Sequence, residues 1–87
     1  GIDNNKLEAA SISMFPNPAN ESTTINFNDN AAKHNVTVTD VTGRVVAKYN
    51  STENSINIST KEINAGIYFV SIQNDRNENA TLKLMVR

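Results

Sequence analysis

The longest apolar run in the chain is Gly66–Ile72, which reads Gly-Ile-Tyr-Phe-Val-Ser-Ile. Its β-branched and aromatic residues are typical of a packed β-strand. Side chains alternate between the two faces of a strand, and both faces are apolar here. One face carries Ile67 and Phe69; the other carries Tyr68, Val70 and Ile72. We therefore expect a central strand with one face on the main core and the other covered at least partly by a loop or a neighbouring chain, and Phe69 is expected to be buried.

Shorter segments before and after this run alternate in the same way. Inward apolar positions are expected at Ile12 and Met14, Ile25 and Phe27, Val36 and Val38, Ile56 and Ile58, and Leu82, Leu84 and Val86. A further strand is expected over Arg44–Tyr49. About seven short strands without a convincing helix predict an all-β fold, an immunoglobulin-like antiparallel β-sandwich.

Turn signals separate these strands. Asp40-Val41-Thr42-Gly43 predicts a hairpin turn, since Asp at the first position can bond back to the backbone and Gly at the fourth accepts a left-handed conformation. Asn28–Asn30 and Asn74–Asn77 predict two further turns. Phe15-Pro16-Asn17-Pro18 should end the first strand at a sheet edge, because two prolines remove two backbone donors.

The 87 residues are enough for one small domain. Residues 1–10 are polar and lack strand alternation, so we expect a linker there and the folded domain over residues 11–87. The sequence begins with Gly1 rather than Met, from which we expect a module of a longer protein. No apolar run reaches the roughly 20 residues that a membrane-spanning helix needs, and no signal peptide is visible.

The net charge of −1 gives no electrostatic case for binding nucleic acid or an anionic membrane. Without cysteine, neither a disulfide framework nor a thiolate zinc site is possible. The only histidine, His34, is expected to be a solvated loop residue. Asn28-Asp29-Asn30 supplies oxygen ligands for calcium, but a plain turn is the favoured interpretation. We expect no enzyme activity, and no catalytic, cofactor-binding or metal-binding residue.

Four motifs occur in a recognisable order along the chain. They are Ile12–Pro18 (ISMFPNP), Val38–Val46 (VTDVTGRVV), Ile63–Val70 (INAGIYFV) and Leu82–Arg87 (LKLMVR). Together they resemble the C-terminal sorting domain of cargo proteins of the bacterial type IX (Por) secretion system. Met85 replaces a commoner β-branched residue. The signal-motif residues that the resemblance implies are Pro16, Asn17, Pro18, Asp40, Gly43, Arg44, Gly66, Tyr68, Lys83, Val86 and Arg87.

The resemblance implies a secretion signal. Such a domain directs an N-terminal passenger from the periplasm through the outer-membrane translocon to the cell surface or the medium. A sortase-like peptidase then removes the domain. The implied partners are therefore the translocon, the peptidase and the passenger, and no nucleic acid.

Several residues keep two interpretations. Arg44 is either an exposed turn residue or a contact with the secretion machinery. Lys83 and Arg87 are either edge charges that discourage aggregation or the residues that a receptor reads. For Tyr68 we favour packing, with its hydroxyl anchoring a corner.

The alternative function is a fibronectin-like or carbohydrate-binding accessory module of a secreted enzyme. Sugar-binding modules usually present exposed aromatic side chains, but the chain has five aromatic residues and no Trp. Alternation assigns most of them to the core. A purely structural spacer is a third possibility.

Overall fold

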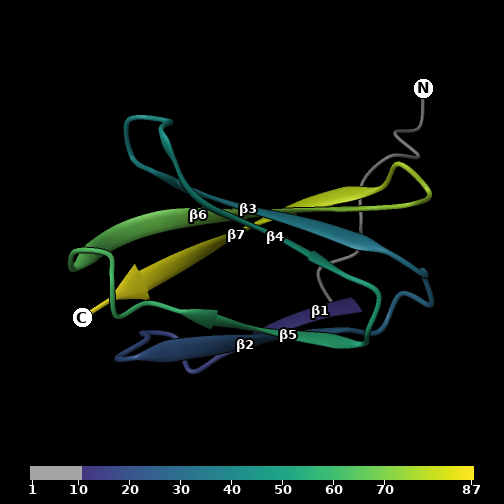
Figure 1. The fold of residues 1–87 in the computed structure, drawn as a ribbon, viewed down its shortest axis with the longest axis horizontal. Helices are drawn as coiled ribbons and strands as arrows, with labels where there is room; N and C mark the ends of the chain where they lie inside the picture. Colours follow the sequence, from purple (N-terminus) through teal and green to yellow (C-terminus); the bar gives the residue numbers. More distant parts are fainter. Residues whose placement is uncertain (1–10) are drawn as a thin grey trace.

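A computed structural model of the chain describes residues 11–87, which form two packed β-sheets (Figure 1). The linker expected over residues 1–10 lies outside the described residues. The strands are β1 (Ile12–Phe15), β2 (Ser22–Phe27), β3 (His34–Asp40), β4 (Val45–Ser51), β5 (Ser55–Ser59), β6 (Gly66–Asn74) and β7 (Asn79–Val86).

One sheet has three strands in the order β1-β2-β5, and the other has four in the order β4-β3-β6-β7. Every pairing between neighbouring strands is antiparallel. The predicted sandwich of about seven strands is therefore confirmed. The expected central strand is also confirmed, because β6 lies between β3 and β7 and, at nine residues, is the longest strand.

The core forms where the alternating apolar faces of the two sheets meet. Along β2, Thr23, Ile25 and Phe27 are buried while the residues between them are partly exposed. On the opposite sheet, most of the predicted inward residues of β3, β6 and β7 are buried, and the exception is Leu82, which is half-buried. The buried ones are Val36, Val38, Tyr68, Val70, Ile72, Leu84 and Val86.

The expectation that Phe69 is buried is wrong, whereas cover of this face by a neighbouring chain stays a prediction. Ile67 and Phe69 point away from the three-stranded sheet and expose 37% and 38% of their surface. Each sheet of a two-layer sandwich packs with one face only, so the outward residues of a central strand meet solvent even when they are apolar. Alternation correctly separates the two faces of β6, but Phe69 is not buried.

The loops between the strands follow the turn signals closely. Residues 41–44 join β3 to β4 as a hairpin whose turn begins at Asp40, and residues 75–78 join β6 to β7. Among residues 11–87, no helix is long and apolar enough to cross a membrane.

Candidate functional site

Each of the four sequence motifs has part of its length at one end of the sandwich, which we call the motif end. Strand register places them there: Asp40, the last residue of β3, lies opposite Tyr68 of β6. Gly66 at the start of β6 lies opposite Val86 at the end of β7. In Figure 1 this end is on the left, beside the label C. Residues far apart in the sequence therefore share one surface.

Asn17 binds the backbone of β7 through its side chain. Its Nδ2 atom donates a hydrogen bond to the carbonyl oxygen of Lys83 at 2.9 Å, and its Oδ1 atom accepts one from the N–H of Met85 at 3.0 Å. A primary amide offers the same donor and acceptor as a peptide group. Asn17 thus takes the place of a neighbouring strand residue along the outer edge of β7.

Ala19 continues this pairing with its backbone. Its N–H bonds the carbonyl oxygen of Met85 at 2.7 Å, and its carbonyl oxygen accepts from the N–H of Arg87 at 2.9 Å, in a parallel bridge. Ala19 is fully buried. Thr23 holds the preceding loop by donating from Oγ1 to the carbonyl oxygen of Pro16 at 2.9 Å. The edge of β7 from Lys83 to Arg87 is therefore closed by a loop, as exposed edges in native proteins often are.

The Asp40–Gly43 turn is held by one carboxylate. Oδ1 of Asp40 accepts hydrogen bonds from Oγ1 of Thr42 at 2.6 Å, from the N–H of Thr42 at 2.9 Å and from the N–H of Arg44 at 3.0 Å. The bond from the Thr42 hydroxyl is the largest influence on the pKa of Asp40, which lies below its ordinary value. Gly43 has a φ of 91°, the left-handed conformation that the sequence predicts.

Tyr68 joins β6 to the loop before it. Its hydroxyl donates to the carbonyl oxygen of Asn64 at 2.6 Å, and its ring is buried. This bond runs to the backbone four residues upstream, as in the corner that the sequence predicts for an immunoglobulin-like fold.

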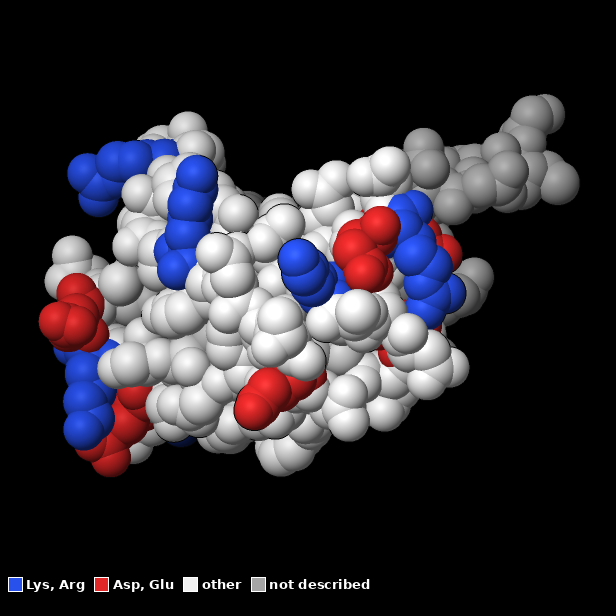
Figure 2. All heavy atoms as spheres, turned by 45° about the vertical axis from the view of Figure 1, so that its right-hand side comes forward, with Lys and Arg blue, Asp and Glu red and all other residues white. Residues whose placement is uncertain are grey.

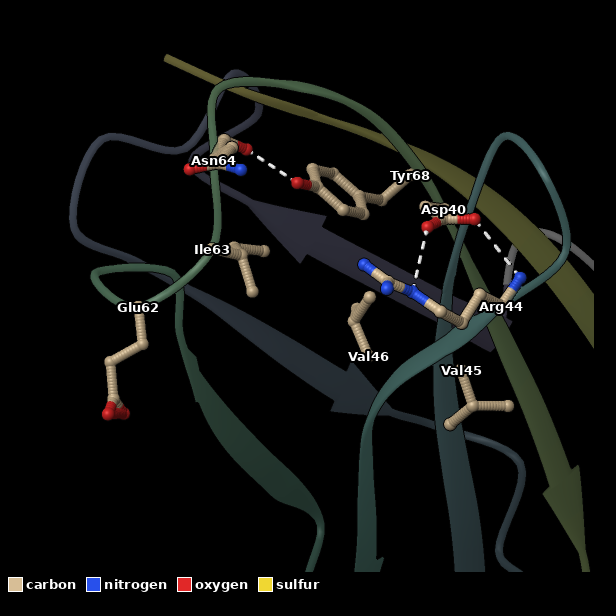
Figure 3. A pocket seen from close by; sticks show the side chains of 8 residues that line it. All are labelled: Asp40, Arg44, Val45, Val46, Glu62, Ile63, Asn64 and Tyr68. Atoms are coloured by element: carbon tan, nitrogen blue, oxygen red, sulfur yellow. Dashed lines mark hydrogen bonds and ion pairs between the residues drawn. The ribbon is translucent and has the colours of Figure 1, made fainter.

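A pocket of about 480 Å³ lies between this corner and the Asp40 turn (Figure 3). The Arg44 side chain extends over it from one side, with Nε 3.4 Å from Oδ2 of Asp40, while Ile63 and Asn64 line the other side. The Arg44 side chain keeps 78% of its surface exposed, so its cation remains accessible.

The charged residues at the end of the chain, Lys83 in β7 and Arg87 directly after it, are also accessible. Lys83 and Arg87 are exposed, and within residues 11–87 neither lies within ion-pair distance of a carboxylate. On the face that Figure 2 shows, acidic and basic side chains are interspersed with broad uncharged areas. Val86, the other predicted motif residue in β7, is buried. It therefore contributes to the core and not to the surface.

The opposite end of the sandwich holds a buried polar cluster, and here the prediction for His34 is wrong. His34 is the first residue of β3 and is 2% exposed. Its Nε2 lies 2.8 and 2.9 Å from the two carboxylate oxygens of Asp29. Its ring stacks on Phe27 with the centroids 3.8 Å apart.

Asp29 organises this cluster. Nδ2 of Asn74 donates to its Oδ2 at 3.0 Å, and the N–H of Ala31 donates to Oδ1 at 3.2 Å. Burial raises the pKa of Asp29, but the hydrogen bonds from Asn74, His34 and Ala31 outweigh it and leave the pKa below its ordinary value. Both carboxylate oxygens are engaged within the protein. Among residues 11–87, no group of three or more His, Cys, Asp or Glu side chains is placed to hold a metal ion. The cluster ties the loop after β2 to β3 and β6.

The contacts of Asn17 and Ala19 with β7 were missed from the sequence. Asn17 was a predicted motif residue, but its partners lie 66 and 68 positions away, and no local pattern identifies them. One signal was available: an amide side chain between two prolines offers hydrogen bonds where the flanking backbone has no N–H to give.

Comparison with known proteins gives a consistent result. A family described as "Secretion system C-terminal sorting domain" matches residues 13–87. An endo-acting ulvan lyase of Formosa agariphila is 31% identical over an alignment 88 positions long, which covers 99% of this chain and 17% of the lyase. The chain thus spans about a sixth of the length of that relative.

A solved structure shares the fold. It is that of PorZ, a bacterial surface component of the type IX secretion system of Porphyromonas gingivalis. It matches with a TM-score of 0.75 and 19% identity, over 90% of this chain and 12% of PorZ. At this identity the likeness concerns the fold alone.

Proposed function

The chain belongs to the family of type IX secretion system C-terminal sorting domains, and we propose that it directs an attached N-terminal passenger from the periplasm through the outer-membrane translocon. The passenger then reaches the cell surface or the medium, and a sortase-like peptidase removes the domain. The observation that carries this proposal is the family match over residues 13–87, which includes all of β2 to β7. It favours an export signal over a fibronectin-like or carbohydrate-binding accessory module.

The described residues support a signal that acts by shape. Asn17 and Ala19 fix the edge of β7, and pairing with β6 fixes its other side. The backbone of Lys83 is thereby held in a defined position in the sheet, and Arg87 directly follows the end of β7. A receptor that reads these cations would recognise a surface that exists only in the folded domain.

Cleavage by a peptidase requires a chain segment that can bind in the active site in an extended conformation. Strand residues are committed to sheet hydrogen bonds, so cleavage within the sandwich would require local unfolding. We propose that the peptidase cuts within or before residues 1–10, which precede β1.

An export assay tests the proposed function. A periplasmic reporter is fused to residues 1–87 in a strain with an intact type IX system, and the reporter is measured in periplasm, surface and medium. We expect the fusion to reach the surface or the medium, and to remain in the periplasm when Lys83–Arg87 are deleted. Export of the deleted fusion at the wild-type level would disprove a sorting role.

The deletion also removes Leu84 and Val86 from the core, so loss of folding must be separated from loss of recognition. The double variant Lys83→Ala with Arg87→Ala serves this purpose, because exposed charges contribute little to stability. Reduced export of this folded variant assigns recognition to the two cations. Normal export would place the signal elsewhere on the folded surface.

A further inference from the structure

Exposed apolar side chains gather at the motif end. Among the described residues, six large hydrophobic side chains are exposed: Phe15, Val41, Val45, Ile67, Phe69 and Met85. Phe15 and Met85 lie near the ends of β1 and β7, and Val41 lies in the turn between β3 and β4. Val45 begins β4, and Ile67 and Phe69 lie in the first half of β6. A distribution over the whole surface would need no explanation, whereas clustering on one area is typical of an interaction site.

Strand register joins most of them into one patch on the outward face of the four-stranded sheet. Ile67 lies directly opposite Met85, and Phe69 lies diagonally from Met85 on the same face. Thr39 of β3 lies between Val45 and Phe69, since it pairs with Val45 on one side and with Phe69 on the other. We call Val45, Ile67, Phe69 and Met85 the outer patch. Farther from the motif end, the same face is polar, with Thr37, Ser71 and Thr81 in one row.

The outward face is also one-sided in charge. Lys83 lies directly opposite Phe69, within the outer patch, and Lys48 lies opposite Thr37 in the polar row. No outward-facing position of β3, β4, β6 or β7 is Asp or Glu. The face therefore offers apolar area together with a cation that has no ion-pair partner within residues 11–87.

We propose that the outer patch and Lys83 form the docking surface for a component of the secretion machinery, whose contacting surface is apolar and carries carboxylates. This inference rests on the proposed function and specifies its recognition surface. Apolar contact supplies affinity at the centre of such an interface, while opposite charges steer the approach and fix the register.

Two other occupants fit the face less well. Binding to an anionic membrane typically takes clusters of about 4–8 basic residues. The outward face has only Lys48 and Lys83 on its strands, in a chain of net charge −1. A second copy of this chain packed face to face in a symmetric pair would bring two cationic faces together.

Matched substitutions on the same face test the proposal with the reporter fusion. Phe69→Glu is compared with Gln73→Glu, since both residues are exposed on the outward face of β6. Lys83→Glu is compared with Lys48→Glu, which changes the net charge equally. We expect Phe69→Glu and Lys83→Glu to lower export by about tenfold or more, as loss of central contacts does at protein interfaces. Gln73→Glu and Lys48→Glu should be exported like the wild type.

The outcomes separate the two proposals. If the wild-type fusion is not exported, the proposed function fails. If the wild type and all four variants are exported equally, the sorting role stands and the docking surface is disproved. If Lys48→Glu impairs export as much as Lys83→Glu, total charge rather than the outer patch is responsible, which also overturns the proposal. Thermal unfolding of the purified variants verifies that each is folded.

Photo-crosslinking tests the chemistry of the partner. The probe is p-benzoylphenylalanine placed at Met85 during export, with the same probe at Gln73 as the control. We expect a crosslink from position 85 to a protein of the secretion machinery, at a peptide with both apolar and acidic residues. A crosslink to a second copy of the chain, to a basic peptide or to lipid would contradict the proposal.

Discussion

Oδ1 of Asn17 accepts a hydrogen bond from the backbone N–H of Met85 at 3.0 Å, although 68 positions separate the two residues. This contact joins the first motif of the chain to the last. Because the same side chain also donates to Lys83, one residue closes two adjacent positions on the edge of β7. The Pro-Asn-Pro segment is therefore a structural partner of β7 and not only the end of β1.

Replacing Asn17 should loosen this edge. We expect Asn17→Ala to lower the free energy of unfolding by about 1–2 kcal/mol, since it removes two hydrogen bonds to backbone. Asn17→Asp should destabilise more, because its carboxylate would face the carbonyl oxygen of Lys83 without a proton to donate. Urea unfolding measures both, with exposed Asn20→Ala as the control. Equal stability of Asn17→Ala and Asn20→Ala would contradict the proposed role.

Neighbouring residues of β6 should respond differently to truncation. Ile72 is fully buried on the inward face, so Ile72→Ala should cost about 2–5 kcal/mol. Phe69 is 38% exposed on the outward face, so we expect Phe69→Ala to cost about 1 kcal/mol or less. Chemical denaturation of both variants gives the comparison. A loss for Phe69→Ala as large as that for Ile72→Ala would mean that the outward face is covered.

Asp29 should make stability fall in acid. Its folded-state pKa is below the ordinary value, so its stabilising contribution is present above the unfolded pKa of about 4 and is lost as the pH falls through the folded pKa. We expect Asp29→Asn to flatten the decrease in unfolding free energy between pH 5 and pH 3, both values being about one unit from that ordinary pKa. Urea titrations across this range measure it. The prediction fails if wild type and variant lose stability in parallel.

The site of peptidase cleavage is open to direct measurement. Mass spectrometry of the released passenger should find its C-terminus within or before residues 1–10, because the hydrogen-bonded strands begin at Ile12. A passenger that retains residues beyond Phe15 would show that the peptidase enters the sandwich.

Local alternation was enough to predict the strands, the inward residues and the hairpin turns. It could not predict which face of β6 meets solvent. Ile67 and Phe69 are as apolar as the residues between them, and their exposure depends on where the second sheet packs. Alternation distinguishes two faces but does not identify the buried one when both are apolar.

His34 shows a different limit. Its immediate neighbours, Lys33 and Asn35, are polar, which favoured an exposed loop. The buried His34 ring is paired with Asp29 through Nε2 and stacks on Phe27, and Asn74 binds Asp29 from 45 positions away in the sequence. Polar contacts between residues far apart in the sequence produce no periodic pattern that could predict them. For the same reason the residue types of the motif end were predictable, but the bonds that assemble it were not.

The antiparallel register determines at which end of the sandwich the chain enters the domain. Ile12 pairs with Phe27 at the His34 end, so the chain enters the sandwich at the end opposite to Lys83 and Arg87. The two ends are separated by the length of the strands, about 25 Å for the eight residues of β7. If the proposed receptor binds at Lys83 and Arg87 and the proposed peptidase cuts before β1, recognition and cleavage occur at opposite ends of the domain. The two steps then do not compete for the same surface.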